Sequence, residues 1–407
     1  MRILLVSGIR PWDPFGGALR TGQIARSLAE TGEVDLLVMP LDRNHGAGPP
    51  TGLFGDVTIV EQEYSMLDTR RSTVRTLDET LRGVPAAQIH RMRKVLAARA
   101  AEVLGRRPYD LVWYMREHVW LMTRGIVRAR TVVDVDDFRD VVLERWRTLG
   151  LTEQGTPLTW QARLRMTREI NWWRRTHPVV EKGADRLIVS SEVDRRRLAS
   201  DKAMVIPNTY ALRQESRAAG DRDNARPPTI LFQGILRWGP NADAVHRLVH
   251  DIAPLVRAQV PDVRILLVGK VNERIERYAE QPGVEVTGQV PEMAPYLCQT
   301  DVIAVPLRIG GGTRIKILEA FAHHVPVVSS TIGAEGIDAV PGTHLYIEDS
   351  DERFAQRCVT LLKDQQAARE MAERAHALYT ARHRPEHCSE AVRQVVGSVV
   401  AGVSADD

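Results

Sequence analysis

The sequence predicts an α/β protein built from two Rossmann-like, doubly wound domains, each with a parallel sheet. Apolar runs of strand length alternate with helix-like stretches, as expected where parallel strands are buried on both faces. A single polar stretch interrupts this alternation, which then restarts. The chain has 407 residues, which is long enough to bury two full cores.

The first domain is predicted to span residues 1–206. Its opening strand, RILLVSG (2–8), is followed by a glycine-containing loop, a helix over 18–32 and a second strand over 33–40. A β-loop-α-β start of this kind favours a doubly wound layer. The charged, Trp-rich residues 138–178 are expected to form helices at the edge of the domain. Further buried strands are expected at 109–115, 130–137 and 185–191.

A linker is predicted at residues 207–228, which are polar, lack periodicity and end in two prolines. The second domain is predicted to span 229–384. A helical piece follows over 385–407, with packing back on the first domain as one arrangement open to it. Strands of the second domain are expected at 229–235, 263–270, 284–290, 301–307 and 325–331, and helices at 241–259, 314–324 and 351–380.

The composition is that of an ordinary soluble globular protein, with 43% hydrophobic and 26% charged residues. The formal net charge is only +3, and the arginines are scattered rather than gathered in a stripe. We therefore expect no nucleic-acid partner. The oligomeric state is left open.

The cellular location is predicted from the cysteines and from the apolar segments. Cys298, Cys358 and Cys388 are odd in number and far apart, which favours a reducing compartment. The apolar run at the N-terminus is too short for a signal peptide, and no segment reaches the ~18 apolar residues of a spanning helix. We expect a cytoplasmic protein. Peripheral contact with the inner membrane face stays open, because scattered arginines can form a patch on one surface.

One short stretch, RIGGGTRIKILEA at 308–320, carries the clearest sign of chemistry. It follows the predicted strand 301–307, so its glycines should lie at the carboxyl edge of a parallel sheet, where the next helix begins. Unpaired backbone N–H groups and the helix dipole make such a position an anion site, and Arg314 and Lys316 add formal charge. Backbone contacts to the anion are expected from Gly310, Gly311, Gly312 and Thr313.

An acid, Glu319, follows these bases and needs its own explanation. An ionised carboxylate only accepts hydrogen bonds, so it can take both hydroxyl protons of a ribose ring. The motif therefore suits a ribonucleoside diphosphate, with the bases on the pyrophosphate and Glu319 on the ribose. The alternative is a tight structural turn followed by a surface pair of Lys316 and Glu319 on one helix face.

Residues 305–337 resemble the nucleotide-sugar-binding signature of family 4 glycosyltransferases, in the branch with a GGGTRIKxLEA motif. Segments 1–38, 184–208 and 231–245 are similar to the family's opening strand and loop, the end of its first domain and the start of its second. The resemblance spans nearly the whole chain. It implies the GT-B fold, in which two Rossmann-like domains face a cleft.

The resemblance also implies an activity, which is transfer of a sugar from a UDP- or GDP-linked donor to a hydroxyl acceptor. The acceptor would be a glycan, a lipid-linked sugar or a secondary metabolite, bound mainly by the first domain. The family retains the anomeric configuration and needs no obligatory metal. No cofactor and no metal site are therefore expected.

Three glycines outside the central motif are expected to contact the donor. Gly16 and Gly17 match the family's loop that approaches the diphosphate and the donor sugar, with a flexible turn after Pro14 as the alternative. Gly288, within the strand predicted at 284–290, completes the set.

The chain departs from the family pattern at two places. Many members carry two glutamates eight positions apart, and here the second is Glu319 while Gly311 stands at the first. Many members also carry an Arg and a Lys after the first strand of the second domain, where this chain offers Arg237 and Asn241. We expect the bases of the 308–320 motif to take over the phosphate contacts of that pair.

The residues predicted to be catalytic are Arg314, Lys316 and His118. The two bases would stabilise charge on the leaving phosphate. His118, in YMREHVW after a strand, would contact the acceptor or the donor sugar, and a hydrogen-bonded structural histidine is the alternative. The acidic run Asp134–Asp137 is similar to the metal-binding D-x-D of another transferase fold, but a structural or cleft-lining role is favoured.

Two other interpretations remain open because Gly311 replaces an acid that contacts the sugar in many members. The chain would then be a nucleotide-sugar epimerase or hydrolase of the same fold, or a non-catalytic nucleotide-sugar-binding protein. The first would act on the donor alone, and the second would bind the donor without turnover.

Overall fold

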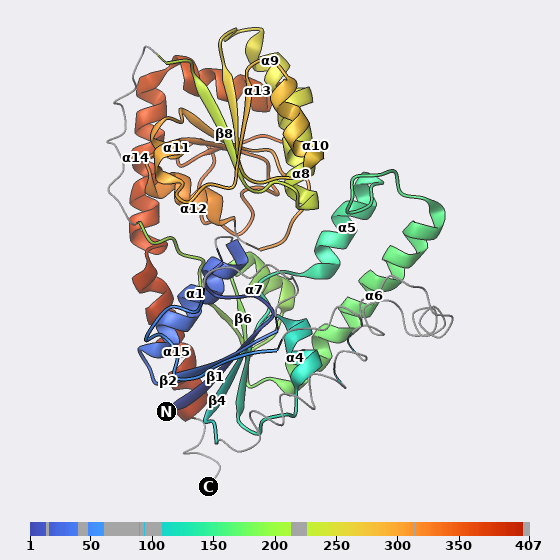
Figure 1. The fold of residues 1–407 in the computed structure, drawn as a ribbon, viewed down its shortest axis with the longest axis vertical. Helices are drawn as coiled ribbons and strands as arrows, with labels where there is room; N and C mark the ends of the chain where they lie inside the picture. Colours follow the sequence, from blue (N-terminus) through green and yellow to red (C-terminus); the bar gives the residue numbers. More distant parts are fainter. Residues whose placement is uncertain are drawn as a thin grey trace. The chain divides into compact units, whose positions relative to one another are not determined.

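The structure is a computed structural model, and it describes residues 1–13, 16–39, 48–60, 89, 93, 108–212, 226–312 and 314–401. The chain folds as two compact units (Figure 1). Unit 1 consists of Met1–Arg147, Leu158–Pro207 and Glu386–Asp407. Unit 2 consists of Thr148–Pro157 and Asn208–Pro385.

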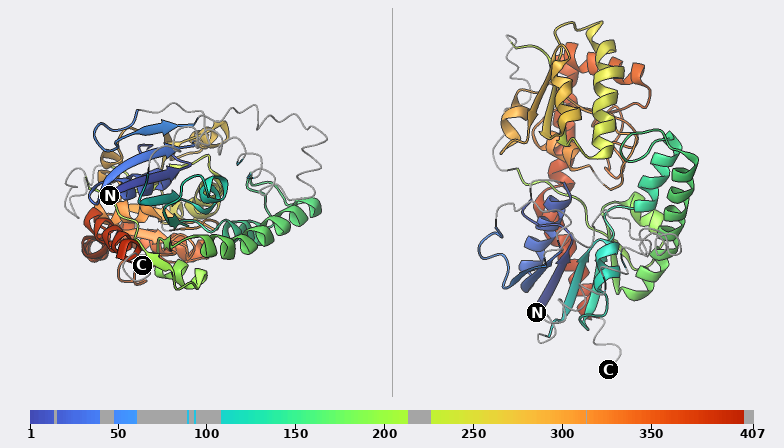
Figure 2. Two further views of the ribbon diagram at one scale, coloured as in Figure 1. Left: turned by 90° about the horizontal axis from the view of Figure 1, so that it is seen from below. Right: turned by 45° about the vertical axis from the view of Figure 1, so that its right-hand side comes forward.

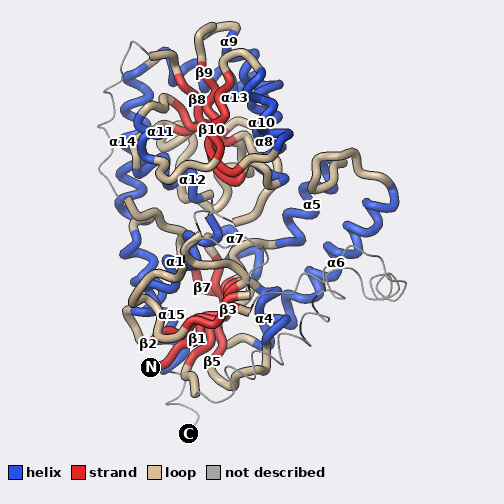
Figure 3. Tube along the Cα trace, in the orientation of Figure 1, coloured by secondary structure: helices blue, strands red, loops and turns tan. Residues whose placement is uncertain are grey.

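Unit 1 is built around a sheet of parallel strands in the order β3-β2-β1-β4-β5-β6-β7. The strands are β1 (Arg2–Ser7), β2 (Glu33–Val38), β3 (Val57–Ile59), β4 (Leu111–Met115), β5 (Arg130–Asp134), β6 (Arg186–Val189) and β7 (Ala203–Val205). Every side chain of β4 is buried, because helices cover both faces of the sheet (Figure 3). The chain leaves β1 in both directions, so the switch point of this sheet lies between β1 and β4.

The helices of unit 1 are α1 (Gly16–Ala29), α4 (Glu117–Thr123), α5 (Arg139–Leu149), α6 (Trp160–Gly183), α7 (Glu192–Leu198) and α15 (Pro385–Val400). Although α15 comes from the end of the chain, its apolar face joins the core of unit 1. Val392, Val395 and Val399 are buried there together with Ile24 and Leu28 of α1. The C-terminal helix is therefore a structural part of the first unit.

Unit 2 has a second parallel sheet, in the order β10-β9-β8-β11-β12-β13. Its strands are β8 (Thr229–Ile235), β9 (Arg264–Lys270), β10 (Val284–Gly288), β11 (Val302–Val305), β12 (Val327–Ser329) and β13 (Tyr346–Ile347). The order again spreads in both directions from the first strand, β8. The switch point therefore lies between β8 and β11.

The helices of unit 2 are α8 (Gly239–Arg247), α9 (Ala253–Arg257), α10 (Glu273–Glu276), α11 (Ala294–Cys298), α12 (Ile315–Ala322), α13 (Asp351–Lys363) and α14 (Gln365–Arg382), with a π-helical turn at Leu248–Ile252 and a 3-10 turn at Arg277–Glu280. α13 packs against α9 and α14, and α12 packs against α14. Figure 2 shows these helices around the sheet from two further directions.

The predicted fold class is confirmed, since both units are α/β layers with parallel sheets. The single helix predicted over 241–259 is wrong in detail, because the π-helical turn separates α8 from α9. Pro254 has no N–H and cannot continue the α-helical hydrogen bonds there. The helical tail predicted over 351–380 is two helices, and the Asp364 side chain caps the second by accepting from the Ala367 N–H at 3.0 Å.

The region predicted as a linker is partly ordered against unit 2. Residues 208–212 belong to that unit, and Tyr210 and Leu212 pack against its core. The Tyr210 N–H donates to the His383 carbonyl at 3.0 Å, and the His383 ring hydrogen-bonds the Asn208 carbonyl at 3.0 Å. The beginning and the end of the main segment of unit 2 are thus tied to each other.

Candidate functional site

The 308–320 motif lies at the switch point of the unit 2 sheet. β8 and β11 are neighbours there, and parallel sheets bind ligands at the carboxyl ends of strands on either side of such a point. The loop from β11 to α12 turns at Gly310 and Gly312, whose φ angles are 147° and 66°. These conformations favour glycine. Thr313 lies outside the described residues.

Arg314 immediately precedes α12 and is buried. Its guanidinium Nη1 donates to the carbonyl of Gly311. Its own carbonyl accepts from the Ile317 N–H at 2.9 Å, so the first turn of α12 is built on this residue. A guanidinium charge therefore lies beside the N-terminus of α12, where the helix dipole also favours an anion.

Lys316, on the first turn of α12, is held by neutral groups. Its Nζ donates to the Asn241 side-chain oxygen at 3.0 Å and lies 3.9 Å from the centre of the Phe232 ring. Among the described residues no carboxylate forms an ion pair with it. Burial, followed by the charge of Arg314, lowers the pKa of Lys316 well below its usual value, and Glu319 opposes this shift.

Asn241 connects the end of β8 to the first turn of α12. Its amide nitrogen donates to the Ile235 carbonyl at the end of β8 at 3.0 Å, and its oxygen receives the Lys316 ammonium. Asn241 is therefore a neutral support for the lysine.

Glu319 lies three residues further along α12, and its carboxylate receives two side-chain hydrogen bonds. The donors are the amide of Gln233, at the end of β8, and the hydroxyl of Tyr210. Burial raises the pKa of Glu319 to about 7, with Tyr210, Lys316 and Gln233 acting in the opposite direction. The buried Gln233 Oε1 has no hydrogen-bond partner among the described residues, so this corner still offers an acceptor.

The remaining predicted donor contacts in unit 2 lie along the same edge of the sheet. Arg237 follows β8, is exposed, and forms no side-chain ion pair in the described part of the chain. Gly288 ends β10, two strands from β8, with a φ angle of 72°. A Cβ at Gly288 would meet nothing within 4 Å. Its position thus shows no close approach, and its role remains a prediction.

In unit 1, His118 lies on α4 at the carboxyl end of the neighbouring strands. A Cβ added at Gly8, directly after β1, would lie 3.6 Å from His118 Nε2. Burial, followed by the charges of Arg116 and Arg139, lowers the pKa of His118 to about 3. The ring is therefore neutral near pH 7, so it can orient a hydroxyl group but does not act as a cation.

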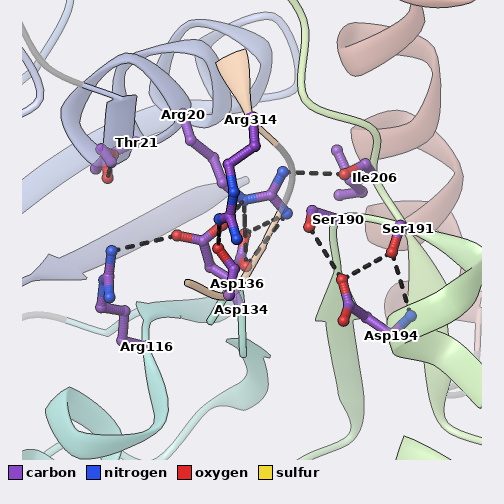
Figure 4. Close-up of polar contacts among 12 residues, drawn as sticks. Arg20, Thr21, Arg116, Asp134, Asp136, Ser190, Ser191, Asp194, Ile206 and Arg314 are labelled. Atoms are coloured by element: carbon purple, nitrogen blue, oxygen red, sulfur yellow. Dashed lines mark hydrogen bonds and ion pairs between the residues drawn. The ribbon is translucent and has the colours of Figure 1, made fainter. Parts of the chain in front are cut away.

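The acidic run at the end of β5 is engaged by arginines (Figure 4). The buried Arg20 of α1 binds Asp134 at 3.0–3.3 Å, pairs with Asp136 at 3.5 Å and donates to the Ile206 carbonyl at 3.0 Å. Arg116 pairs with Asp136 at 3.3 Å. Asp136 and Arg116 both have positive φ angles, of 44° and 82°. This arrangement supports a structural role for the run, since its first two carboxylates already neutralise two guanidinium groups.

The glycines predicted to contact the donor in unit 1 form the beginning of α1. Gly16 is exposed and is the first residue of the helix, and the Gly17 carbonyl accepts from the Thr21 hydroxyl at 2.8 Å. Both glycines therefore lie at a helix N-terminus, and their approach to a donor stays a prediction.

A cluster that sequence patterns do not predict joins three helices of unit 1. The His177 ring on α6 hydrogen-bonds Glu117 of α4 at 2.7 Å and Asp140 of α5 at 3.3 Å. Both carboxylates are buried. Burial opposes the charged form, but the hydrogen bonds that the ring donates to Asp140 and Glu117 raise the pKa of His177 to about 9. A charged histidine therefore holds α4, α5 and α6 together.

Sequence reasoning also misses Gln233, Tyr210 and Phe232 in unit 2. Gln233 and Phe232 belong to a strand that reads as a plain buried run, and Tyr210 belongs to a stretch that reads as linker. The only available signal was the polar Gln233 inside the apolar run TILFQGI. Its position before a glycine at a strand end is typical of a residue that lines a site.

Comparison with known proteins gives a family for part of the chain. Residues 227–364 match the family described as Glycosyl transferases group 1. A GDP-mannose-dependent monoacylated alpha-(1-6)-phosphatidylinositol monomannoside mannosyltransferase of Corynebacterium glutamicum is 33% identical over 138 residues. That alignment covers 30% of this chain and 36% of the relative. An uncharacterized 44.6 kDa protein in the cps region of Klebsiella pneumoniae is 23% identical over 152 residues, covering 35% and 39%.

Each alignment thus spans little more than a third of a curated relative. The matched family segment contains every predicted contact of unit 2, from Arg237 to Glu319.

Solved structures match nearly the whole chain. Sucrose-phosphate synthase from Thermosynechococcus elongatus has a TM-score of 0.69 at 18% identity, covering 98% of this chain and 99% of its own. Anabaena HepE in complex with UDP-glucose has a TM-score of 0.65 at 14% identity, covering 98% and 100%. WaaG, a glycosyltransferase involved in lipopolysaccharide biosynthesis, gives 0.61 at 13%, also covering 98% and 100%. At these identities the likeness shows the fold, which is GT-B.

The His177 cluster should make the free energy of unfolding fall as the pH becomes alkaline. The folded state binds the His177 proton more tightly than the unfolded state, so the stabilisation is complete below pH 6.5 and is lost as pH rises through about 9. We expect the free energy of unfolding to fall by up to roughly 3 kcal/mol over that window. His177→Gln should remove most of this slope in denaturant titrations at several pH values. The exposed His250→Gln is the control, and an unchanged slope in His177→Gln would contradict the assignment.

Proposed function

We propose that this chain, whose residues 227–364 match the group 1 glycosyl transferases, is a retaining glycosyltransferase that moves a sugar from a UDP- or GDP-linked donor to a hydroxyl acceptor. One observation carries the proposal. Lys316 is desolvated beside Arg314, yet its direct partners are an amide oxygen and an aromatic face. Glu319 acts on this ammonium only from three residues away on α12, so no carboxylate of the described residues contacts it directly, and a diphosphate would supply that contact.

In this proposal the pyrophosphate lies against α12. The amides of Gly310 to Gly312, the helix dipole, Arg314 and Lys316 would all face it. An anion next to Lys316 would raise the lysine's lowered pKa, so donor binding would fix its proton. The Gln233 oxygen and the Glu319 carboxylate offer acceptors for hydroxyl groups, and we assign Glu319 to the ribose.

Catalysis would be mainly electrostatic. As the bond between sugar and phosphate breaks, negative charge builds on the leaving diphosphate, and the preorganised Arg314 and Lys316 would stabilise it. No obligatory metal is proposed, since these two cations and the helix terminus supply the positive charge. The acceptor is assigned to unit 1, where the neutral His118 would orient a hydroxyl group. Gly311 places backbone where many relatives keep an acid, so sugar contacts there would come from amides.

Lys316→Ala tests the diphosphate site directly. We expect the affinity for the matching nucleoside diphosphate to fall about tenfold to a hundredfold, because a charge-assisted contact is lost. Calorimetric titration with UDP, GDP and their sugars measures this, and transfer to a panel of glycan and lipid-linked acceptors should fall roughly a hundredfold or more. The exposed Lys363→Ala on α13 is the matched control.

Three results would count against the proposal. If Lys316→Ala bound the nucleoside diphosphate with wild-type affinity, the diphosphate would not bind against α12. Release of free sugar or an isomer from the donor alone would indicate a hydrolase or epimerase, and tight donor binding without turnover on any acceptor would indicate a binding protein.

Ribose recognition by Glu319 should depend on pH and on Tyr210. Glu319 accepts ribose hydroxyls only when ionised, so the preference for a ribonucleoside diphosphate over its 2′-deoxy form should weaken as pH falls below about 7. Tyr210→Phe removes a hydrogen bond to the charged form, so the midpoint should move to higher pH by roughly one unit. Titrations across pH measure both. Tyr346→Phe on β13 is the control, and an unmoved midpoint in Tyr210→Phe would refute this role.

A further inference from the structure

The outward face of α6 combines exposed basic and exposed large apolar residues. Its exposed residues recur at helical spacing and form one continuous stripe, which we call the α6 stripe. The α6 stripe consists of Trp160, Leu164, Arg168, Asn171, Arg175, Val179 and Lys182. Arg163 and Arg165 are also exposed and flank it.

The opposite face of α6 is buried and packs against unit 1, so the α6 stripe faces solvent. Met166, Ile170, Trp173 and Val180 are buried on that inner face. Figure 2 shows α5 and α6 side by side, and the ion pair between Arg139 and Glu169 joins them, along with the pairs of Arg174 with two α5 acids. The charged His177 adds the contact to α4 and α5.

The α6 stripe and its flanks carry positive charge that is not neutralised within the described residues. Five exposed cations, Arg163, Arg165, Arg168, Arg175 and Lys182, form no ion pair with the part of the chain that the structure describes. The acids of α6 do not offset them, since Glu169 pairs with Arg139 and Glu181 is half-buried. The face therefore favours an anionic partner.

The same stripe exposes large apolar side chains among its cations. Trp160 is 72% exposed, Leu164 is 47% exposed and Val179 is 44% exposed. Trp160 and Leu164 lie one turn apart at the N-terminal end of the helix. A tryptophan and a leucine next to basic residues match the water–lipid interface, where rings and aliphatic chains lose water while cations stay among headgroups.

We infer that the α6 stripe is a docking surface for an anionic lipid bilayer. The cations would lie against acidic headgroups, and Trp160 and Leu164 would enter the boundary between headgroups and acyl chains. A nucleic-acid backbone would use the cations but would leave the apolar side chains in water. No helix in the described ranges has the length and apolar character to cross a membrane, so the contact is peripheral. The inference does not depend on the proposed transferase activity.

Vesicle flotation of the full chain tests the inference. We compare vesicles of phosphatidylcholine alone with vesicles of equal parts phosphatidylcholine and phosphatidylglycerol. We expect binding to the anionic vesicles only, weakening as salt is raised. Arg168→Gln with Arg175→Gln and Lys182→Gln should lower the partition roughly a hundredfold, at about fivefold per charge. Trp160→Gln with Leu164→Gln should lower it by about tenfold.

A matched control separates the stripe from general surface charge. Arg353→Gln with Lys363→Gln and Arg369→Gln removes three exposed cations from α13 and α14 of unit 2. Thermal unfolding of each variant should match the wild type, because all the altered side chains are exposed. Absence of wild-type binding to anionic vesicles, equal binding to neutral vesicles, or an equal loss in the control would each overturn the inference.

Discussion

A desolvated cation without a carboxylate partner is the constraint around which unit 2 is arranged. Lys316 is presented by the first turn of α12, and its ammonium contacts an amide oxygen of Asn241 and the face of Phe232. Both supports come from β8 or the residues just after it, which only the parallel pairing of β8 and β11 brings next to α12. Moving a carboxylate into contact with Lys316 would satisfy the charge internally and remove the reason for an anion to bind.

Glu319 is the acid of this site, and its carboxylate is hydrogen-bonded by neutral groups instead of contacting Lys316. Its carboxylate receives hydrogen bonds from Gln233 and Tyr210 and is kept three residues from Lys316 on the helix. Tyr210 is also fixed by the His383 carbonyl and by the Tyr379 hydroxyl, which donates to the Tyr210 carbonyl at 2.9 Å. The acid proposed to bind ribose is therefore supported by residues close to both ends of the main segment of unit 2. Unit 1 solves a similar problem differently, since Asp134 and Asp136 are neutralised internally by Arg20 and Arg116.

Sequence patterns predict the elements and the residues that lie together in one local segment. They miss contacts between segments that only the order of the strands brings together. Long apolar runs such as 2–8 and 229–235 identify buried strands, whereas β3, β7 and β13 are too short to show a pattern. Arg314, Lys316 and Glu319 are predictable because they share one loop and helix. Gln233 and Asn241 reach them across 86 and 75 residues of sequence, and no local spacing encodes such a contact. The helical break before Pro254 follows from the missing N–H, but the pattern of apolar residues masks it.

The most direct test of the central claim is a crystal structure of the protein with the nucleoside diphosphate that binds tightest. The account predicts electron density for the pyrophosphate against Arg314, Lys316 and the backbone of Gly310 to Gly312, with both ribose hydroxyls on Glu319. Density for the diphosphate away from α12, for example beside Arg116 in unit 1, would contradict it.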